Sequence, residues 1–251
     1  MKRVVLNIFA FFLFFAGQIN PQQFSSGSPE WLIDMFFSKS SFPDKANYFS
    51  GTMLEESDKP TIGEELNGKG EIFFHQIKAT NDENVFAVEV KLEDKVIDFY
   101  CYLQKQNDVW KIYAVRRFIL PEFVFQVIDS LSQLPSLTDS SLYLSLKLFI
   151  LNDAQLKEYF VANSDAFNKL INYFNQDNKV EGDRMLAKLG LSAIFRDKNF
   201  PGCIFLLINS FQSIGAGFIY AGESAKLPEI SANDLIYLEE IIPGWFVFRS
   251  I

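Results

Sequence analysis

The sequence is poor in the side chains that most often do chemistry. It contains one histidine and two cysteines in 251 residues. So few cysteines exclude a disulfide-dense small protein, and a single histidine leaves a Ser or Cys triad without a well-supported base. No CxxC or HxxxH spacing is present, so we expect no metal site and no cofactor.

Basic residues are also few, with 23 Lys and Arg against 31 Asp and Glu and a net charge of −8. We therefore expect no nucleic-acid partner, because no broad basic surface is available to neutralise phosphates. Apolar residues are plentiful, at 49% of the chain with 28 Phe. That composition excludes wholesale disorder and provides the core of one or two packed domains.

The N-terminus has the pattern of an export signal. Lys2 and Arg3 precede an apolar run at 4–16, which is too short to span a bilayer. We predict a signal peptide at 1–17, with cleavage between about Gly17 and Gln23, and a secreted or periplasmic product without stable membrane insertion. An uncleaved anchor and a buried N-terminal helix are the alternatives.

The first half of the remaining chain, residues 28–120, predicts one helix and four strands. Ser28 is a good N-cap and Pro29 a good first residue, so we expect a helix at 29–38. Gly and Pro are frequent in the polar stretch that follows, where we predict no regular structure. Apolar residues then alternate with polar ones, as in the strands of an antiparallel meander. The predicted strands are 71–79, 86–92, 97–103 and 109–115, with a hairpin at Glu93-Asp94-Lys95.

A helix, an irregular connection and a meander that ends in Val109-Trp110-Lys111-Ile112-Tyr113-Ala114-Val115 resemble the NTF2-like and cystatin-like superfamilies. The resemblance covers about residues 28–120. These families include enzymes, ligand binders and interaction modules, so the resemblance implies a fold but no single function. In the enzymes of the NTF2-like group, a carboxylate or His in the cone of the sheet abstracts a proton beside a Tyr or an acid.

The second half, residues 121–251, predicts helices followed by a mainly antiparallel sheet, so we expect an α+β protein. Apolar residues recur at helical spacing in five segments, at 121–134, 136–151, 154–160, 167–174 and 185–191. Strands are predicted at 203–208, 217–221, 235–242 and 245–248.

His75 is the only candidate catalytic residue. It shares a strand face with Phe73 and Ile77, which is a candidate for the concave face of the meander. Four further polar residues lie on neighbouring strands, on the face opposite Phe86: Glu89, Asp98, Tyr100 and Tyr102. They form either part of a site or an ordinary amphipathic outer face. Glu239 and Glu240 are adjacent, so they diverge on a strand.

Three tyrosines, Tyr100, Tyr102 and Tyr113, are the candidate binding residues. Tyr is frequent at interfaces, and these side chains either pack on the second half of the chain, contact an outside partner or are scattered on the surface. Cys101 and Cys203 either pair or act as small core residues.

Arg116 and Arg117 either hold an anionic ligand or are ordinary solvated and salt-bridged side chains. We favour a non-enzymatic binding or interaction protein whose protein or small-molecule partner the sequence does not identify. The alternative is a small-molecule enzyme or ligand carrier that uses the cone around His75. An open pocket with His75 and an acid favours the alternative, and a cone filled by Phe and Trp favours the first.

Overall fold

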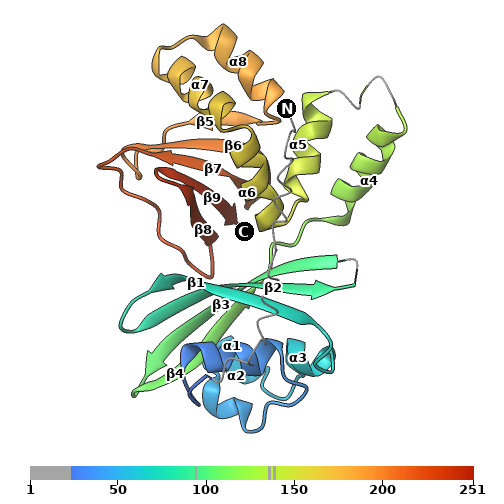
Figure 1. Ribbon diagram of the computed structural model, residues 1–251, viewed down its shortest axis with the longest axis vertical. Helices are drawn as coiled ribbons and strands as arrows, with labels where there is room; N and C mark the ends of the chain where they lie inside the picture. Colours follow the sequence, from blue (N-terminus) through green and yellow to red (C-terminus); the bar gives the residue numbers. More distant parts are fainter. Residues whose placement is uncertain (1–23, 94, 135–136, 138–139) are drawn as a thin grey trace, which may run out of the picture.

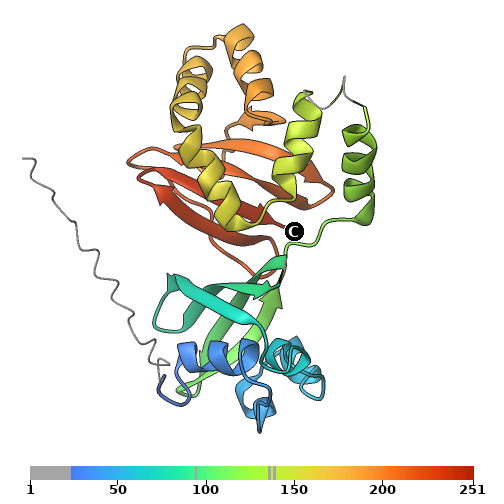
Figure 2. The same ribbon diagram turned by 45° about the vertical axis from the view of Figure 1, so that its right-hand side comes forward.

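The computed structural model describes residues 24–93, 95–134, 137 and 140–251. They form two halves stacked along the long axis of the molecule, each built on one antiparallel sheet (Figures 1 and 2). The predicted α+β class is confirmed. The predicted signal peptide and its cleavage region lie outside the described residues.

The first helix, α1 (Pro29–Phe37), begins where the sequence predicts. The Ser28 hydroxyl accepts a hydrogen bond of 3.2 Å from the Trp31 backbone N–H, which caps the helix. The polar stretch that follows contains three short helical segments: η1 (Lys45–Tyr48), α2 (Thr52–Glu55) and α3 (Ile62–Glu65). The sequence did not predict them, because four residues are too few to show a helical period.

The four predicted strands form a meander in the order β1-β2-β3-β4. Their bounds are β1 (Glu71–Ala79), β2 (Glu83–Leu92), β3 (Lys95–Gln106) and β4 (Val109–Arg116). The predicted hairpin after β2 includes Asp94, which lies outside the described residues; pairing continues up to Leu92 opposite Lys95. We call the sheet face that packs on α1 the inner face, and the opposite one the outer face.

The C-terminal half places its helices before its sheet, as predicted. The helices are α4 (Glu122–Ser132), α5 (Ser141–Phe149), α6 (Asp153–Ala162), α7 (Ser164–Asn175) and α8 (Lys179–Lys188). The strands are β5 (Ala193–Phe195), β6 (Cys203–Phe211), β7 (Ile214–Ala221), β8 (Leu235–Ile242) and β9 (Trp245–Ser250), paired in the order β5-β6-β7-β9-β8. The three-residue β5 was not predicted, because it is too short to show an alternating pattern. The helix predicted at 136–151 begins only at Ser141, capped by the Ser140 hydroxyl.

Two apolar clusters hold these layers together. The first joins α1 and the phenylalanines that follow it to the inner face of the meander. The second joins the outer face, including Ala87, Tyr100 and Tyr102, to the C-terminal half. We call this second contact region the seam. Cys101 is buried in the first cluster and Cys203 in the second, and both are free, so they are core residues and not a disulfide.

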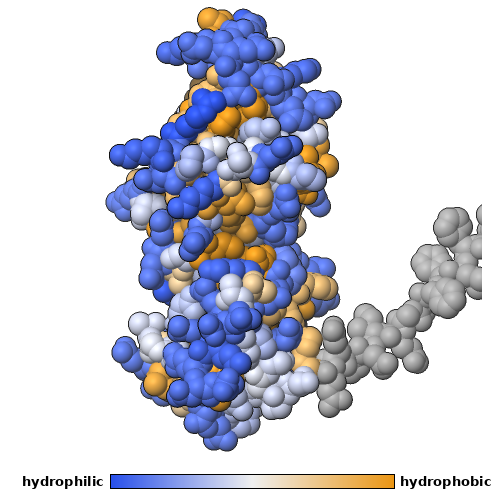
Figure 3. Space-filling view, turned by 90° about the vertical axis from the view of Figure 1, so that its left-hand side faces the viewer, coloured by the Kyte–Doolittle hydropathy of each residue, from blue (hydrophilic) through white to orange (hydrophobic). Residues whose placement is uncertain are grey.

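The molecular surface follows the same division. On the face shown in Figure 3, apolar side chains gather in a broken strip that extends from the C-terminal half down to the level of the seam, with hydrophilic side chains on both sides. Of the helices that the structure describes, none is long and apolar enough to cross a bilayer.

Candidate functional site

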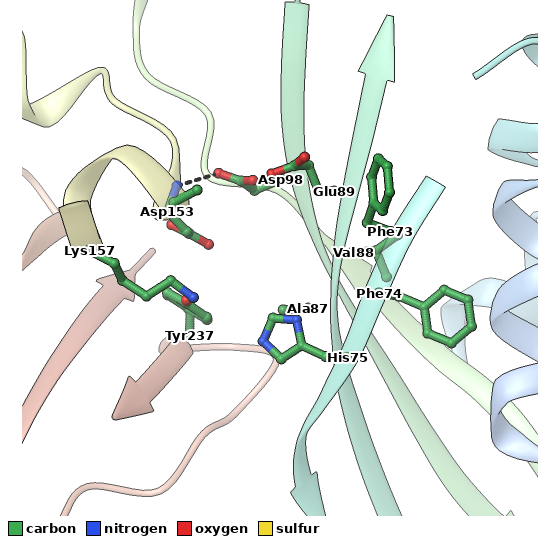
Figure 4. Close-up of a pocket in the computed structure, with 11 residues that line it drawn as sticks. Phe73, Phe74, His75, Ala87, Val88, Glu89, Asp98, Asp153, Lys157 and Tyr237 are labelled. Atoms are coloured by element: carbon green, nitrogen blue, oxygen red, sulfur yellow. Dashed lines mark hydrogen bonds between the residues drawn. The ribbon is translucent and has the colours of Figure 1, made fainter. Parts of the chain in front are cut away.

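The candidate site is a pocket of about 170 Å³ in the seam. It lies between the outer face of the meander, the first turns of α6 and the edge strand β8 (Figure 4). The residues that line it include Phe73, His75, Ala87, Glu89, Asp98, Asp153, Lys157 and Tyr237.

The register of the meander explains why a hollow forms at this place. Phe73 pairs with Glu89, which pairs with Asp98, and in the next row of the same face His75 pairs with Ala87, which pairs with Tyr100. Since alternate residues of a strand face the same side, both rows point into the seam. Ala87 stands in the middle of them, and its short side chain leaves the floor of the pocket open.

One wall is the start of α6, which is tied to the meander by buried polar contacts. The Asp153 backbone N–H donates to Asp98 Oδ2 at 2.9 Å, and the Asp153 carboxylate accepts hydrogen bonds from Tyr100 Oη at 2.7 Å and from Arg249 Nε at 3.1 Å. Arg249 is only 1% exposed, and it also donates to the Leu151 carbonyl at 2.6 Å. The charge of Asp153 is therefore already balanced inside the protein.

Behind the opposite wall, which His75, Lys157 and Tyr237 line, lies a second acid that is fully engaged. Glu239 on β8 lies 2.9 Å from His75 Nε2 and accepts hydrogen bonds from Lys157 Nζ at 3.0 Å and from Tyr237 Oη at 2.7 Å. Burial raises the pKa of Glu239, but the hydrogen bonds from His75, Tyr237 and Lys157 outweigh burial and lower the pKa to about 2. Glu239 is thus ionised at neutral pH, and it holds both His75 and Lys157.

Two other carboxylates of the pocket have no such partner. Glu89 and Asp98 are directly opposite each other on β2 and β3, and neither forms an ion pair with a described Lys, Arg or His. Burial, the charge of Asp153 and the charge of Glu89 raise the pKa of Asp98 to about 7, against the opposing effects of the Asp153 N–H and Arg249. The pocket therefore has an excess of negative charge, concentrated on Glu89 and Asp98.

The structure corrects the expected position of His75. It lies on the outer face, whereas the concave space under α1 is filled by aromatic side chains, among them Phe36, Phe37, Phe42 and Phe49. The cone of the meander is therefore not an open pocket. The polar residues predicted on the outer face, Glu89, Asp98 and Tyr100, do lie beside His75, but in the seam.

The candidate binding tyrosines are used inside the protein. Tyr100 and Tyr102 are 0% exposed, and Tyr102 Oη donates to the Ile236 carbonyl at 2.7 Å. Tyr113 is partly buried and donates to Glu83 at 2.8 Å. The sequence left three interpretations open for these tyrosines. Tyr100 and Tyr102 pack on the second half of the chain, so neither side chain is accessible to an outside partner.

Sequence reasoning missed the residues that the C-terminal half contributes, namely Asp153, Lys157, Tyr237 and Arg249. Glu239 was noted only as diverging from Glu240, and that is what the structure shows: Glu240 accepts a hydrogen bond from the Gly244 N–H at 3.0 Å, away from the pocket. Nothing in the local pattern around these residues indicates that they meet β1, β2 and β3.

No protein-family model, no curated protein and no solved structure matches this chain. The resemblance to the NTF2-like and cystatin-like superfamilies therefore stays a prediction. Among residues 24–93, 95–134, 137 and 140–251, no group of three or more His, Cys, Asp or Glu side chains is arranged to hold a metal ion.

Proposed function

We propose that this protein is an exported, non-enzymatic binding protein that holds the positively charged group of a small organic ligand in the seam pocket. One observation carries the proposal. Glu89 and Asp98 lie side by side at the pocket without a cation from the described chain, whereas Asp153 and Glu239 each have their own. A bound cation removes the repulsion between the two carboxylates, and this gain favours a cationic ligand over a neutral one.

The other residues of the pocket favour an organic ammonium group on an apolar body. Phe73, whose side chain is 56% exposed, stands next to Glu89, and aromatic faces attract cations. Ala87 supplies an apolar floor. A volume of about 170 Å³ resembles that of cavities of about 150 Å³ that accept a benzene ring, so the pocket fits one such group.

Benzylammonium chloride is a suitable probe, with benzyl alcohol as its neutral counterpart. Isothermal titration at pH 8 should show at least tenfold tighter binding of the cation, which corresponds to about 1.4 kcal/mol. Glu89→Gln should weaken this preference, because it removes one of the two carboxylate charges and keeps the shape. Asp183→Asn, on the exposed face of α8, is the matched control and should change nothing. Equal binding of the two probes by the parent protein, or a preference that Glu89→Gln leaves unchanged, contradicts the proposal.

Export is part of the same proposal. Its support is the sequence pattern at Lys2, Arg3 and the apolar run at 4–16. We propose a secreted or periplasmic protein, which meets its ligand outside the cytoplasm.

One observation favours a second candidate, a small-molecule enzyme. A carboxyl group with a pKa of about 7 is suited to general acid–base catalysis at neutral pH, and Asp98 has that pKa inside a pocket that also contains His75. The two candidates differ in the effect of Asp98→Asn. A binding protein loses affinity to a similar degree as with Glu89→Gln, whereas an enzyme loses about 10² to 10⁴ in turnover of its substrate while still binding it.

A further inference from the structure

The edge of β3 is open where β4 has ended. β4 pairs with β3 only from Tyr100, opposite Arg116, onward, so residues 95–99 have a neighbouring strand on the β2 side alone. The chain leaves the sheet after Arg116 and continues to α4 (Figure 1). A length of strand edge thus remains free on the side of the sheet that β4 occupies farther along.

The register identifies the backbone groups at this edge. Lys95 closes the hairpin opposite Leu92, and in an antiparallel pair alternate residues direct their N–H and C=O groups to opposite neighbours. Val96 and Asp98 therefore direct theirs away from β2. No hydrogen bond joins the backbone of either residue to a described residue outside the strands.

A groove of about 690 Å³ lies along this edge. Its lining is mixed: apolar residues, among them Phe118, Ile119, Phe125 and Phe149, alternate with polar ones such as Asn152 and Gln155. Ile119 and Phe125 are 64% and 45% exposed, so the groove opens to solvent. Its volume is within the range of about 300 to 1,000 Å³ that is usual for ligand sites.

The groove also carries positive charge on a protein whose net charge is −8. Lys95 and Arg117 line it, both exposed, and neither forms an ion pair with any residue in the described part of the chain. Arg116, by contrast, is held by the Ala232 carbonyl at 2.6 Å. Arg116 and Arg117 were both candidates for binding an anionic ligand, and of the two only Arg117 has a guanidinium group that the described residues leave free to do so.

We propose that this groove binds an extended peptide segment of a partner protein, which pairs with Val96 and Asp98 as an added strand. Its apolar side chains contact the groove walls, and an acidic residue reaches Lys95 and Arg117. Strand addition is an established mode of peptide recognition in which main-chain hydrogen bonds give affinity and adjacent pockets give specificity. A fatty acid matches the two basic residues and the apolar part of the lining, but it leaves the polar part of the lining and the backbone groups of Val96 and Asp98 without partners, so the open edge favours a peptide.

The probe is an acetylated, fluorescein-labelled hexapeptide of alternating Val and Thr with one terminal Asp. Fluorescence anisotropy with the full chain should show saturable binding. A peptide with N-methyl groups on alternate residues should bind at least tenfold more weakly, because it cannot donate to the strand edge, and this comparison requires no change in the protein. Replacing the terminal Asp by Lys should weaken binding by a similar factor.

Two protein variants locate the site. Val96→Pro removes an outward N–H without touching the β2 ladder, and Arg117→Glu reverses the charge; each should weaken binding at least tenfold, while Lys188→Glu on the exposed end of α8 should not. Circular dichroism and thermal melts establish that the variants are folded. No binding of the parent peptide overturns the proposal, as does equal binding of the N-methylated form or binding that Arg117→Glu leaves unchanged. Laurate that binds the groove when the peptide does not shows an amphiphile site instead.

Discussion

Tyr100 on β3 donates a buried hydrogen bond of 2.7 Å to Asp153, the first residue of α6, and so joins the two halves of the molecule across the seam. Asp153 also accepts from Arg249, so one carboxylate links the meander, α6 and β9. Removing one of these hydrogen-bond donors leaves the buried Asp153 carboxylate with fewer partners, and this lowers the stability of the folded protein.

Tyr100→Phe should therefore lower the free energy of unfolding by about 2 kcal/mol, the usual cost of losing a hydrogen bond to a charged group. Urea unfolding measures the change. Tyr48→Phe is the matched control, because the Tyr48 hydroxyl makes no hydrogen bond to another described residue. Limited proteolysis of the parent chain should not release a stable fragment that ends near Leu120, and ready release of one contradicts the importance of the seam.

The pKa of Asp98 gives the protein an unusual pH dependence. An Asp in the unfolded chain has a pKa of about 3.9, and in the folded protein burial and the nearby carboxylates raise it to about 7. Between these values the folded state binds the proton more strongly, so Asp98 makes stability fall as pH rises from about 4 to 7. Glu239, with a folded pKa of about 2, affects stability only below about pH 4.5 and does not mask this trend.

Asp98→Asn should remove that slope and stabilise the protein at pH 8 by an amount of the order of 2 kcal/mol. The Asn side chain still offers an oxygen to the Asp153 N–H, so the local contact is kept. The measurement is urea unfolding of parent and variant at pH 5 and pH 8. An equal pH slope in both proteins shows that another group is responsible.

His75→Ala should have small effects. The imidazole is 54% exposed, and Glu239 keeps its hydrogen bonds from Lys157 and Tyr237 when His75 is lost. We expect less than about 1 kcal/mol of destabilisation, as for exposed ion pairs, and benzylammonium affinity within threefold of the parent. A loss of biological function of 10² or more in a folded variant contradicts a binding role and supports the enzyme candidate.

Local patterns predicted the elements but not the site. Ser28 and Pro29 define the start of α1, and the alternation along β2 and β3 identifies the outer face that carries Glu89 and Asp98. What covers that face depends on pairs such as His75 and Glu239, which are 164 residues apart in the sequence. Strand periodicity is the same whether a polar face meets solvent or another layer, so the pattern left open whether the outer face is a site, a packing surface or an exposed surface.

The export prediction concerns residues outside the described part of the chain. Expression in a host with a general secretion pathway should give a mature protein whose first residue lies between about Gly17 and Gln23, because Lys2, Arg3 and the apolar run at 4–16 have the form of a signal peptide. N-terminal sequencing or intact-mass measurement identifies that residue. Recovery of an intact Met1 chain from the cytosol contradicts the prediction.

The seam pocket exists because of Ala87. The residues beside it on the outer face, such as His75 and Tyr100, have larger side chains. The methyl group of Ala87, which is 8% exposed, forms the floor of the pocket. Ala87→Leu adds three carbons at that point without altering any charge, so the larger side chain should occupy the space that the ring of benzylammonium takes in our proposal. We expect at least tenfold weaker binding by calorimetry. Stability should change by less than about 2 kcal/mol, because the added carbons enter an existing cavity and not a filled core.

Ala87→Ser is the matched control, since it adds one atom and leaves most of the volume open. It should keep affinity within about threefold of the parent. Because Ala87→Leu leaves Glu89 and Asp98 in place, it separates the shape of the pocket from its charge. Unchanged benzylammonium binding in a folded Ala87→Leu protein means that the cation binds the carboxylates from outside the pocket, and then the seam is a structural contact and not a binding site.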